Sequence, residues 1–232
     1  VISFEILTLS QHEDLIDGEY DYRIEIKDGK NRLDSIVSSI MNSFDFEEEE
    51  ITHVMVQGDT ATAYAIALSA FHHKIPVIHL EAGLRTYDVE NPYPEEFYRQ
   101  CISRIANVHL APTNHEAGFL IQDKVGGEIH VVGNTVLDNL VGIPSSYDNT
   151  VLITMHRREN HHLISEYFKL FSQLAKDNPD LQFVLPLHPN PNVQKHKDLL
   201  DGVLVVDPLP YEQLISSISK CKFIISDSGG IQ

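Results

Sequence analysis

The stretch from His53 to Thr113 decides the fold, and it reads HVMVQGDTATAYAIALSAFHHKIPVIHLEAGLRTYDVENPYPEEFYRQCISRIANVHLAPT. Two short apolar runs, Val54–Val56 and Val77–Leu80, alternate with segments that have helical spacing, which predicts strands and helices in turn. A polar cluster follows each run, beginning at Gly58 and at Glu81. This alternation is typical of an α/β fold with parallel sheets.

Acidic side chains gather where these strands are expected to end. Asp59 follows the first run, Glu81 follows the second, and Glu95 and Glu96 stand at an expected helix start. In open α/β sheets ligands bind beyond the carboxyl ends of the strands, so we expect these acids to face one crevice. Carboxylates act as acid or base near neutral pH when burial or like charges raise their pKa values. The stretch therefore points to proton-transfer chemistry.

The alternation of strands and helices restarts in the second half of the chain. Residues 143–150, rich in Pro, Ser and Asn, break the pattern before a new apolar run begins at Val151. We predict an α/β protein with two Rossmann-like domains, residues 1–142 and 151–232, joined by a linker at 143–150 and with a cleft between them. The loop 226–230 resembles a phosphate cradle without the helix that would complete it, so we expect a chain that is incomplete at both ends.

Composition excludes several classes of function. The net charge of −17 argues against a nucleic-acid binder and against docking on an anionic membrane. No apolar run is long enough to cross a bilayer. Cys101 and Cys221 lie far apart in apolar contexts, which is typical of reduced cysteines in a cytoplasmic protein. None of the 13 histidines lies in a metal-ligand motif, so we expect no metal.

Each acidic candidate in the first half also has a purely structural interpretation. Asp59 could cap the helix that starts near Thr60. Glu81 could pair with Arg85, because an acid that continues an apolar strand is costly without a partner. Glu95 and Glu96 could simply favour a helix N-terminus, and we expect Glu96 to support the site without touching substrate.

The second half has polar candidates at the ends of its predicted strands. His156 is followed by Arg157, whose guanidinium suits diphosphate oxygens, although a lone histidine there is usually structural. His188 and Asn190 follow another strand, with a proline-shaped turn as the alternative. Ser228-Gly229-Gly230 offers a hydroxyl and backbone N–H groups to phosphate, although such a tripeptide is more often just a turn.

The sequence resembles the non-hydrolysing UDP-N-acetylglucosamine 2-epimerases over nearly its whole length. The matching pieces, in chain order, are GDT (58–60), HLEAGLRT (79–86), PYPEE (92–96), APT (111–113), GNT (133–135), HRREN (156–160), HPNPNV (188–193) and DSGGIQ (227–232). Any one of them is a weak signal, whereas eight in the right order are specific. Nothing in the chain corresponds to the Gly-Thr-Arg-Pro-Glu loop at which family members begin.

The resemblance implies a fold, a reaction and a set of site residues. It implies a glycosyltransferase B type fold, a homodimer, and interconversion of UDP-GlcNAc and UDP-ManNAc by elimination and re-addition of UDP, without a metal or nicotinamide cofactor. The implied catalytic residues are Asp59, Glu81, Glu95 and His156. To substrate binding we assign Gln11, His12, Arg85, Arg157, His188, Asn190, Ser228, Gly229 and Gly230; the first two lie where some relatives bind a second, activating UDP-GlcNAc.

Other functions stay open at this point. A close variant of this enzyme would epimerise a UDP-diacetamido-uronic acid, and the sequence does not distinguish that activity from epimerisation of UDP-GlcNAc. A non-catalytic UDP-sugar-binding module is an alternative from another class, against which the retained acids and His156 count. A hydrolysing epimerase ranks low, because the EAGLRT and HRREN forms are not typical of that class. A glycosyltransferase ranks lower still, because the acid cluster would have no role in it.

Overall fold

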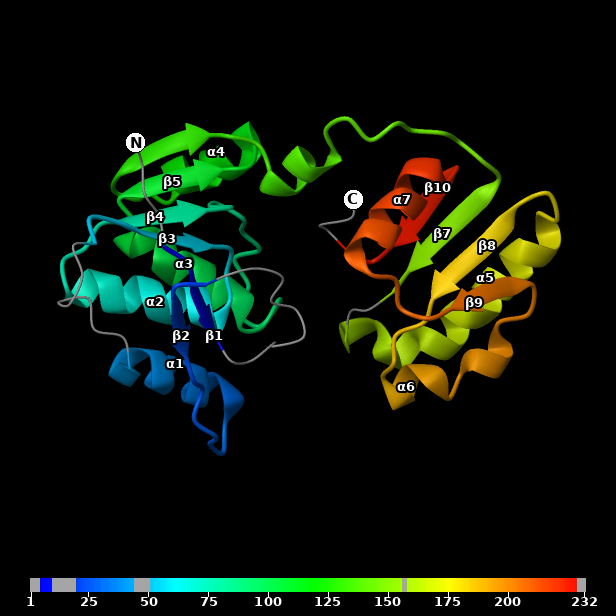
Figure 1. The fold of residues 1–232 in the computed structure, drawn as a ribbon, viewed down its shortest axis with the longest axis horizontal. Coiled ribbons are helices and arrows are strands. Elements are labelled where there is room, and N and C mark those ends of the chain that lie inside the picture. Colours follow the sequence, from blue (N-terminus) through cyan, green and yellow to red (C-terminus); the bar gives the residue numbers. More distant parts are fainter. Residues whose placement is uncertain (1–4, 10–19, 44–50, 156–157, 229–232) are drawn as a thin grey trace. The chain divides into compact units, whose positions relative to one another are not determined.

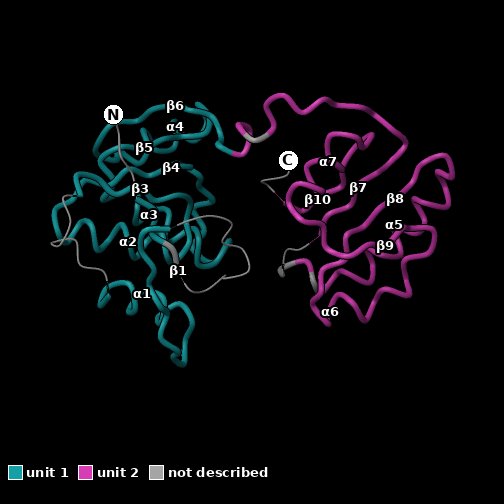
Figure 2. The backbone as a smooth tube through the Cα atoms, in the orientation of Figure 1, with its two compact units in different colours: residues 1–135 teal, residues 136–232 magenta. Residues whose placement is uncertain are grey.

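The computed structural model describes residues 5–9, 20–43, 51–155 and 158–228. The chain divides into two compact units, Val1–Thr135 (unit 1) and Val136–Gln232 (unit 2), coloured teal and magenta in Figure 2. Each unit has its own parallel sheet and its own hydrophobic core. This arrangement confirms the predicted α/β class with parallel strands.

Unit 1 contains a four-stranded parallel sheet in the order β3-β4-β5-β6 (Figure 1). Its strands are β3 (Val54–Gln57), β4 (Val77–Leu80), β5 (Val108–Ala111) and β6 (Glu128–Val131). A separate parallel pair joins β1 (Leu7–Leu9) and β2 (Tyr22–Ile24). Gln57 pairs with Leu80, so the residues that follow β3 and β4 lie side by side. We call this end of the four-stranded sheet the carboxyl edge of unit 1.

The helices of unit 1 pack around an alanine-rich central helix. They are α1 (Arg32–Ser43), α2 (Ala61–His72), α3 (Glu95–Ile105) and α4 (Asn114–Gln122). The buried side chains of α2 are mostly alanines, whose small size lets neighbouring helices approach closely. Ile40 of α1 and Ile102 of α3, both fully buried, join α2 in one apolar cluster. This packing holds α1, α2 and α3 together in the core of unit 1.

Unit 2 contains a four-stranded parallel sheet in the order β10-β7-β8-β9. Its strands are β7 (Thr150–Thr154), β8 (Gln182–Pro186), β9 (Val203–Val206) and β10 (Phe223–Ser226). The chain runs outward from β7 to β9 and then returns to add β10 on the other side of β7. The strand order therefore reverses at β7, and such switch points are where open α/β sheets bind ligands.

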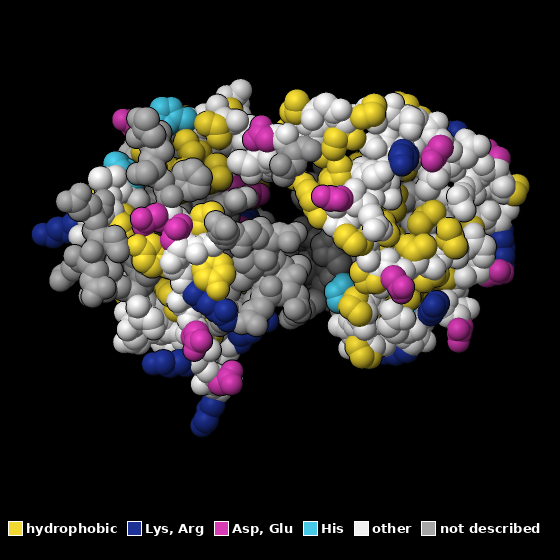
Figure 3. All heavy atoms as spheres, viewed as in Figure 1, with side chains coloured by type: hydrophobic (Ala, Val, Ile, Leu, Met, Phe, Trp, Pro, Cys, Tyr) yellow, Lys and Arg dark blue, Asp and Glu magenta, His cyan; other side chains and the backbone are white. Residues whose placement is uncertain are grey.

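The helices of unit 2 are short except for one. They are α5 (Ile164–Asp177), α6 (Pro191–Gln194) and α7 (Tyr211–Lys220), with 3-10 turns η3 (Thr135–Leu140), η4 (Arg158–Leu163) and η5 (Lys197–Leu199). Phe168 and Phe171 of α5 pack with Phe183 and Leu185 of β8 in the core. Figure 3 shows apolar side chains gathered over β8 on the face toward the viewer, as expected for a parallel strand that is apolar on both faces.

The segment predicted as a linker is attached to the end of α7. The backbone N–H of Ser146 donates to Ser219 O over 2.9 Å, and that of Asp148 donates to Lys220 O over 2.8 Å. The compact units divide earlier, between Thr135 and Val136. The predicted domains at 1–142 and 151–232 stay a prediction.

Candidate active site

Asp59 lies at the carboxyl edge of unit 1 and forms an ion pair with a helix residue. Its Oδ2 atom is 2.5 Å from Nη2 of Arg99 in α3, and its side chain is 22% exposed. The structural alternative for Asp59 as a helix cap is wrong. Thr60 is the N-cap of α2, and its hydroxyl oxygen accepts the N–H of Ala63 over 3.1 Å. The side chain of Asp59 is therefore not used as a helix cap, and it presents its ion pair with Arg99 at the carboxyl edge.

Glu81 directly follows β4 and has an unusual backbone conformation. Its φ angle is +63°, in the left-handed region that costs an L-residue roughly 1–2 kcal/mol. Its half-buried carboxylate makes no hydrogen bond or ion pair with another described residue. A Cβ atom added to Gly58 would lie 3.8 Å from Oε2 of Glu81, so this carboxylate lies against the turn that carries Asp59. Strain of this kind concentrates at functional sites.

The backbone strain at Glu81 leads to a prediction about stability. Glu81→Gly is expected to be more stable than Glu81→Ala by about 1 kcal/mol, because glycine adopts positive φ without steric cost. Urea unfolding of the two variants measures the difference, since neither carries the carboxylate. At an ordinary strand position alanine is the more stable residue. Equal midpoints for the two variants, or a higher one for alanine, would contradict strain at this residue.

Helix α3 begins with two acids that have different surroundings. Glu95 is half-buried, and Arg99 lies four residues later, so both are on one helical face, and this face meets Asp59. Glu96 is fully buried and accepts three hydrogen bonds, from Thr86 N, Tyr87 N and Gln100 Nε2 at 3.0, 3.0 and 2.7 Å. Glu96 thus holds the loop after Glu81 in place, and its supporting role at a substrate site stays a prediction.

The protonation of Glu96 is set by competing effects. Burial by itself would raise its pKa. The hydrogen bonds from Gln100, Thr86 and Tyr87, together with the charge of Arg99, outweigh burial, so the pKa lies below its ordinary value. Arg99 Nη1 lies 3.4 Å from Glu96 Oε2. Arg99 therefore connects a buried, ionised Glu96 to Asp59.

Arg99 does not stand out in the sequence as a site residue, although its side chain is only 11% exposed in the structure. The signal was present, because an arginine four residues after Glu95 lies on the same helical face as that acid. A single arginine within a helix is normally read as part of a solvated face. Its burial depends on contacts with other parts of the fold.

Arg85, assigned to substrate binding, is enclosed by partners from unit 1. Its Nε donates to Asp123 Oδ2 at 2.8 Å, its Nη2 to Ser103 Oγ at 3.0 Å and its Nη1 to Leu84 O at 2.8 Å. Its side chain is 1% exposed. The structural alternative that paired it with Glu81 is wrong, since its ion-pair partner is Asp123. Substrate binding by Arg85 stays a prediction.

In unit 2 the ends of β7 and β10 are joined by polar side chains. Thr154 Oγ1 donates to Ser226 Oγ over 2.8 Å, and Asn160 Nδ2 donates to Asp227 Oδ2 over 3.0 Å. Ser226 Oγ in turn accepts the backbone N–H of Ser228 over 2.9 Å. These bonds place Ser228 at the switch point of the sheet, where the phosphate loop was predicted.

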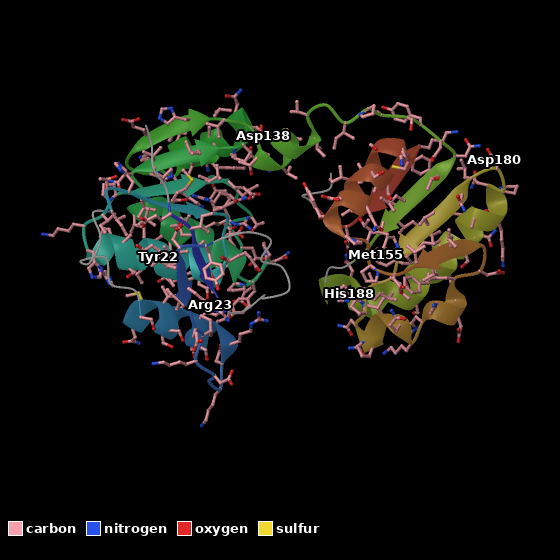
Figure 4. The ribbon with its side chains drawn as sticks, in the orientation of Figure 1. Tyr22, Arg23, Asp138, Met155, Asp180 and His188 are labelled. Atoms are coloured by element: carbon pink, nitrogen blue, oxygen red, sulfur yellow. The ribbon has the colours of Figure 1, made fainter. Side chains whose placement is uncertain are left out.

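His188 and Asn190 form a turn after β8. The Asn190 side chain caps α6 by accepting the N–H of Asn192 over 2.9 Å, and the Asn190 N–H donates to His188 Nδ1 over 3.1 Å. Figure 4 shows His188 and Met155 at one end of the sheet of unit 2 and Asp180 at the other. With Nδ1 accepting, Nε2 of the neutral His188 ring carries the proton and can donate to a ligand.

Six predicted site residues lie outside the described residues. They are Gln11, His12, His156, Arg157, Gly229 and Gly230. Within the described ranges, no group of three or more His, Cys, Asp or Glu side chains could hold a metal ion. In the same part of the chain no helix is both long and apolar enough to span a membrane.

Comparison with known proteins assigns the family. The sequence model of a family described as UDP-N-acetylglucosamine 2-epimerase matches residues 7–232. The chain belongs to the UDP-N-acetylglucosamine 2-epimerase family. The resemblance drawn from the eight sequence pieces is thereby confirmed.

Relatives in the UDP-N-acetylglucosamine 2-epimerase family cover the whole of this chain. Proteins of that name from Neisseria meningitidis and Campylobacter jejuni are each 36% identical to it and match all of it, over 71% and 70% of their own lengths. A crystal structure of the Neisseria meningitidis UDP-GlcNAc 2-epimerase bound to UDP-GlcNAc matches with a TM-score of 0.80. That match has 36% identity and covers 92% of this chain but 65% of the solved chain.

Proposed function

We propose that this protein is a non-hydrolysing epimerase that interconverts UDP-GlcNAc and UDP-ManNAc. The observation that carries the proposal is the grouping of Asp59, Glu81 and the start of α3 at one edge of unit 1, in a chain of the UDP-N-acetylglucosamine 2-epimerase family. Its relatives carry that name, and one of them was solved bound to UDP-GlcNAc. Membership of this family, together with a Glu81 carboxylate that has no hydrogen-bond or ion-pair partner among the described residues, favours catalysis over binding alone.

The proposed reaction proceeds by elimination and re-addition. A base removes the proton from C2 of the sugar, the C2–H electron pair forms a C1=C2 double bond, and the C1–O bond breaks with the electron pair leaving on UDP. UDP then adds back to C1, and an acid delivers a proton to C2 from the opposite face. The net change is inversion at C2, so no oxidant, reductant or cofactor is consumed.

The proposed roles divide between carboxylates and phosphate-binding groups. Asp59, Glu81 and Glu95 together supply the base and the acid, since each lies at or beside the carboxyl edge of unit 1. In unit 2, His156 and Arg157 stabilise the departing diphosphate, and Ser228, Gly229, Gly230, His188 and Asn190 bind UDP. We assign Arg85 to substrate binding as well. Gln11 and His12 are assigned to binding a second, activating nucleotide sugar.

Proton NMR of UDP-GlcNAc with the full-length protein in heavy water tests the proposal. We expect deuterium to appear at C2 while UDP-ManNAc grows in, because the proton removed from C2 exchanges with solvent before re-addition. Heat-inactivated protein provides the control for spontaneous exchange. Free ManNAc together with UDP would instead indicate a hydrolysing enzyme.

Two outcomes of the same measurement would redirect the assignment. Saturable binding of UDP-GlcNAc without exchange would contradict catalysis on this sugar. A parallel sample with a UDP-diacetamido-uronic acid then separates the remaining alternatives. Exchange with that sugar alone would assign the variant epimerase, and no exchange with either would assign a UDP-sugar-binding module.

The proposal includes a homodimer in the cytoplasm. Both Cys101 and Cys221 are free thiols, as in proteins kept in a reducing compartment. A dimer is expected from the family resemblance. Light scattering of the purified full-length protein at micromolar concentration measures the mass, and a monomer mass would contradict the dimer.

A further inference from the structure

A fully buried histidine holds the turn that carries Asp59. His79 is 0% exposed, and its Nε2 atom lies 2.8 Å from the carbonyl oxygen of Gly58. A carbonyl oxygen only accepts hydrogen bonds, so Nε2 must be the donor. The peptide group that contains this carbonyl ends at the Cα atom of Asp59. His79 thus fixes the peptide plane from which the Asp59 side chain projects.

The turn is held from β4 on a second side as well. The backbone N–H of Gly58 donates to Leu80 O over 3.0 Å. Gly58 has a φ angle of +69°, which glycine adopts without strain. Because glycine can adopt many other backbone angles as easily, the residue alone does not fix this conformation. External hydrogen bonds must select the orientation of its carbonyl. Among the described residues, the hydrogen bond to the Gly58 carbonyl oxygen comes from His79.

The ring of His79 is suited to a permanent donor role. Burial lowers the pKa of His79 to about 4, although the hydrogen bond to Gly58 acts in the opposite direction, and the positive charges of Arg85 and Arg99 lower the pKa further. The ring is therefore neutral at neutral pH. Its Nδ1 atom is buried and has no hydrogen-bond partner among the described residues. The single N–H of the neutral ring is thus committed to Gly58.

A second buried histidine provides a natural comparison. His109 on β5 pairs in register with His79, is also 0% exposed, and its Nε2 lies 2.9 Å from Gly126 O. Gly126 precedes β6, so this bond serves the opposite end of the sheet. Burial lowers the pKa of His109 as well. Both histidines are fully buried and form a hydrogen bond to a glycine carbonyl through Nε2, but the two bonds hold different loops.

We propose that His79 is a positioning residue for the epimerase reaction, which orients Asp59 for proton transfer through its hydrogen bond to the Gly58 carbonyl. This inference rests on the proposed function, since it assumes that Asp59 takes part in the chemistry. His79 is buried behind the turn and touches no substrate. Its effect is expected on the rate of the chemical step more than on the binding of UDP-sugar.

The test compares two replacements of similar shape in the full-length protein. His79→Gln keeps an N–H near the position of Nε2, whereas His79→Met fills similar volume without any donor. His79→Met is expected to lower kcat on the order of 10- to 100-fold, the loss typical of a displaced catalytic group, with KM for UDP-GlcNAc changed less than about 3-fold. His79→Gln is expected to restore kcat to within about 3-fold of the original protein.

His109→Met is the matched control. It removes the same kind of buried hydrogen bond from the neighbouring strand, so it is expected to lower the unfolding midpoint by a similar amount. Its kcat is expected to stay within about 3-fold of the original, because Gly126 lies away from Asp59. Equal losses of kcat in both methionine variants would show a general packing effect and overturn the proposal.

The original protein separates this proposal from the proposed function. If it shows no deuterium exchange at C2, the proposed function fails first. If it is active and His79→Met keeps its kcat, only the role of His79 fails. If His79→Met does not fold, long-range ¹H–¹⁵N spectra of the histidine rings in the original protein test the hydrogen bond directly. We expect the His79 ring to be neutral and protonated at Nε2 between pH 6 and 8, because its pKa is about 4 and Nε2 donates to Gly58. A proton on Nδ1 in that range would overturn the proposal.

Discussion

Asp59→Asn is expected to lower the rate of deuterium exchange at C2 of UDP-GlcNAc by about 10²- to 10⁴-fold, the usual contribution of a positioned acid or base. Asparagine has the same shape, and its amide oxygen can still accept a hydrogen bond from Arg99, but it cannot take a proton. The free energy of unfolding is expected to fall by at most about 2 kcal/mol, since a hydrogen bond to a charged group is kept. The NMR assay and urea unfolding measure the two quantities.

Asp201→Asn is the control for this replacement. Asp201 also pairs with a cation, Lys176, over 2.8 Å, but both side chains are exposed in unit 2. The same chemical change is expected to leave the exchange rate unaltered there, because a surface ion pair contributes little. If Asp59→Asn exchanged deuterium as fast as Asp201→Asn, Asp59 would have no part in proton transfer.

Gly83→Ala is expected to destabilise unit 1 by about 3 kcal/mol, which combines backbone strain with overpacking. Gly83 has a φ angle of +98°, and a Cβ atom there would lie 2.8 Å from the carbonyl carbon of Glu116 and closer still to its oxygen. That carbonyl belongs to the first turn of α4, which cannot move without disturbing the sheet. The midpoint of urea unfolding, followed by circular dichroism, measures the loss.

Gly118→Ala, within α4 itself, gives the opposite expectation. Nothing lies within 4 Å of a Cβ atom at Gly118, which is exposed in the interior of α4. Alanine there is expected to raise stability by roughly 0.5–1 kcal/mol, the difference in helix propensity. Similar midpoints for the two alanine variants would show that α4 and the Gly83 loop are not in close contact.

Periodicity predicted most of the fold correctly. Apolar runs of three to five residues became β3, β4, β7 and β8, because a buried parallel strand is apolar along its length. Apolar residues recur at helical spacing from Leu33 to Met41, and this segment forms α1, which runs from Arg32 to Ser43. The compact units divide between Thr135 and Val136, and the predicted domain boundaries at 142 and 151 stay a prediction. Hydrogen bonds from residues 143–150 to the end of α7 attach that segment to unit 2, and sequence pattern does not register such contacts.

The candidate site was only partly accessible from sequence. Asp59, Glu81 and Glu95 stood out because an acid at a strand or helix end is visible in one dimension. Arg99 and His79 did not, since their roles depend on partners 40 and 21 residues away in the chain, Asp59 and Gly58. A charged residue can cap a helix, form a buried ion pair or face solvent, and which of these it does depends on the residues that the fold places beside it. The same reason explains why the structural alternative for Arg85 named Glu81, and not Asp123, as its partner.

The construction of β4 has a consequence for how chain length can vary in this family. His79 and Leu80 form hydrogen bonds to Gly58, and Glu81 follows directly after them. Val77 lies two residues before His79, on the same face of the strand, and is buried in the core. Inserting or deleting one residue between Val77 and Glu81 would turn every later side chain to the opposite face of the sheet. The core contact, the support of the turn and the carboxylate would be lost in one step. Relatives that differ in length are therefore expected to place their gaps in the surface loops and to keep this five-residue segment intact.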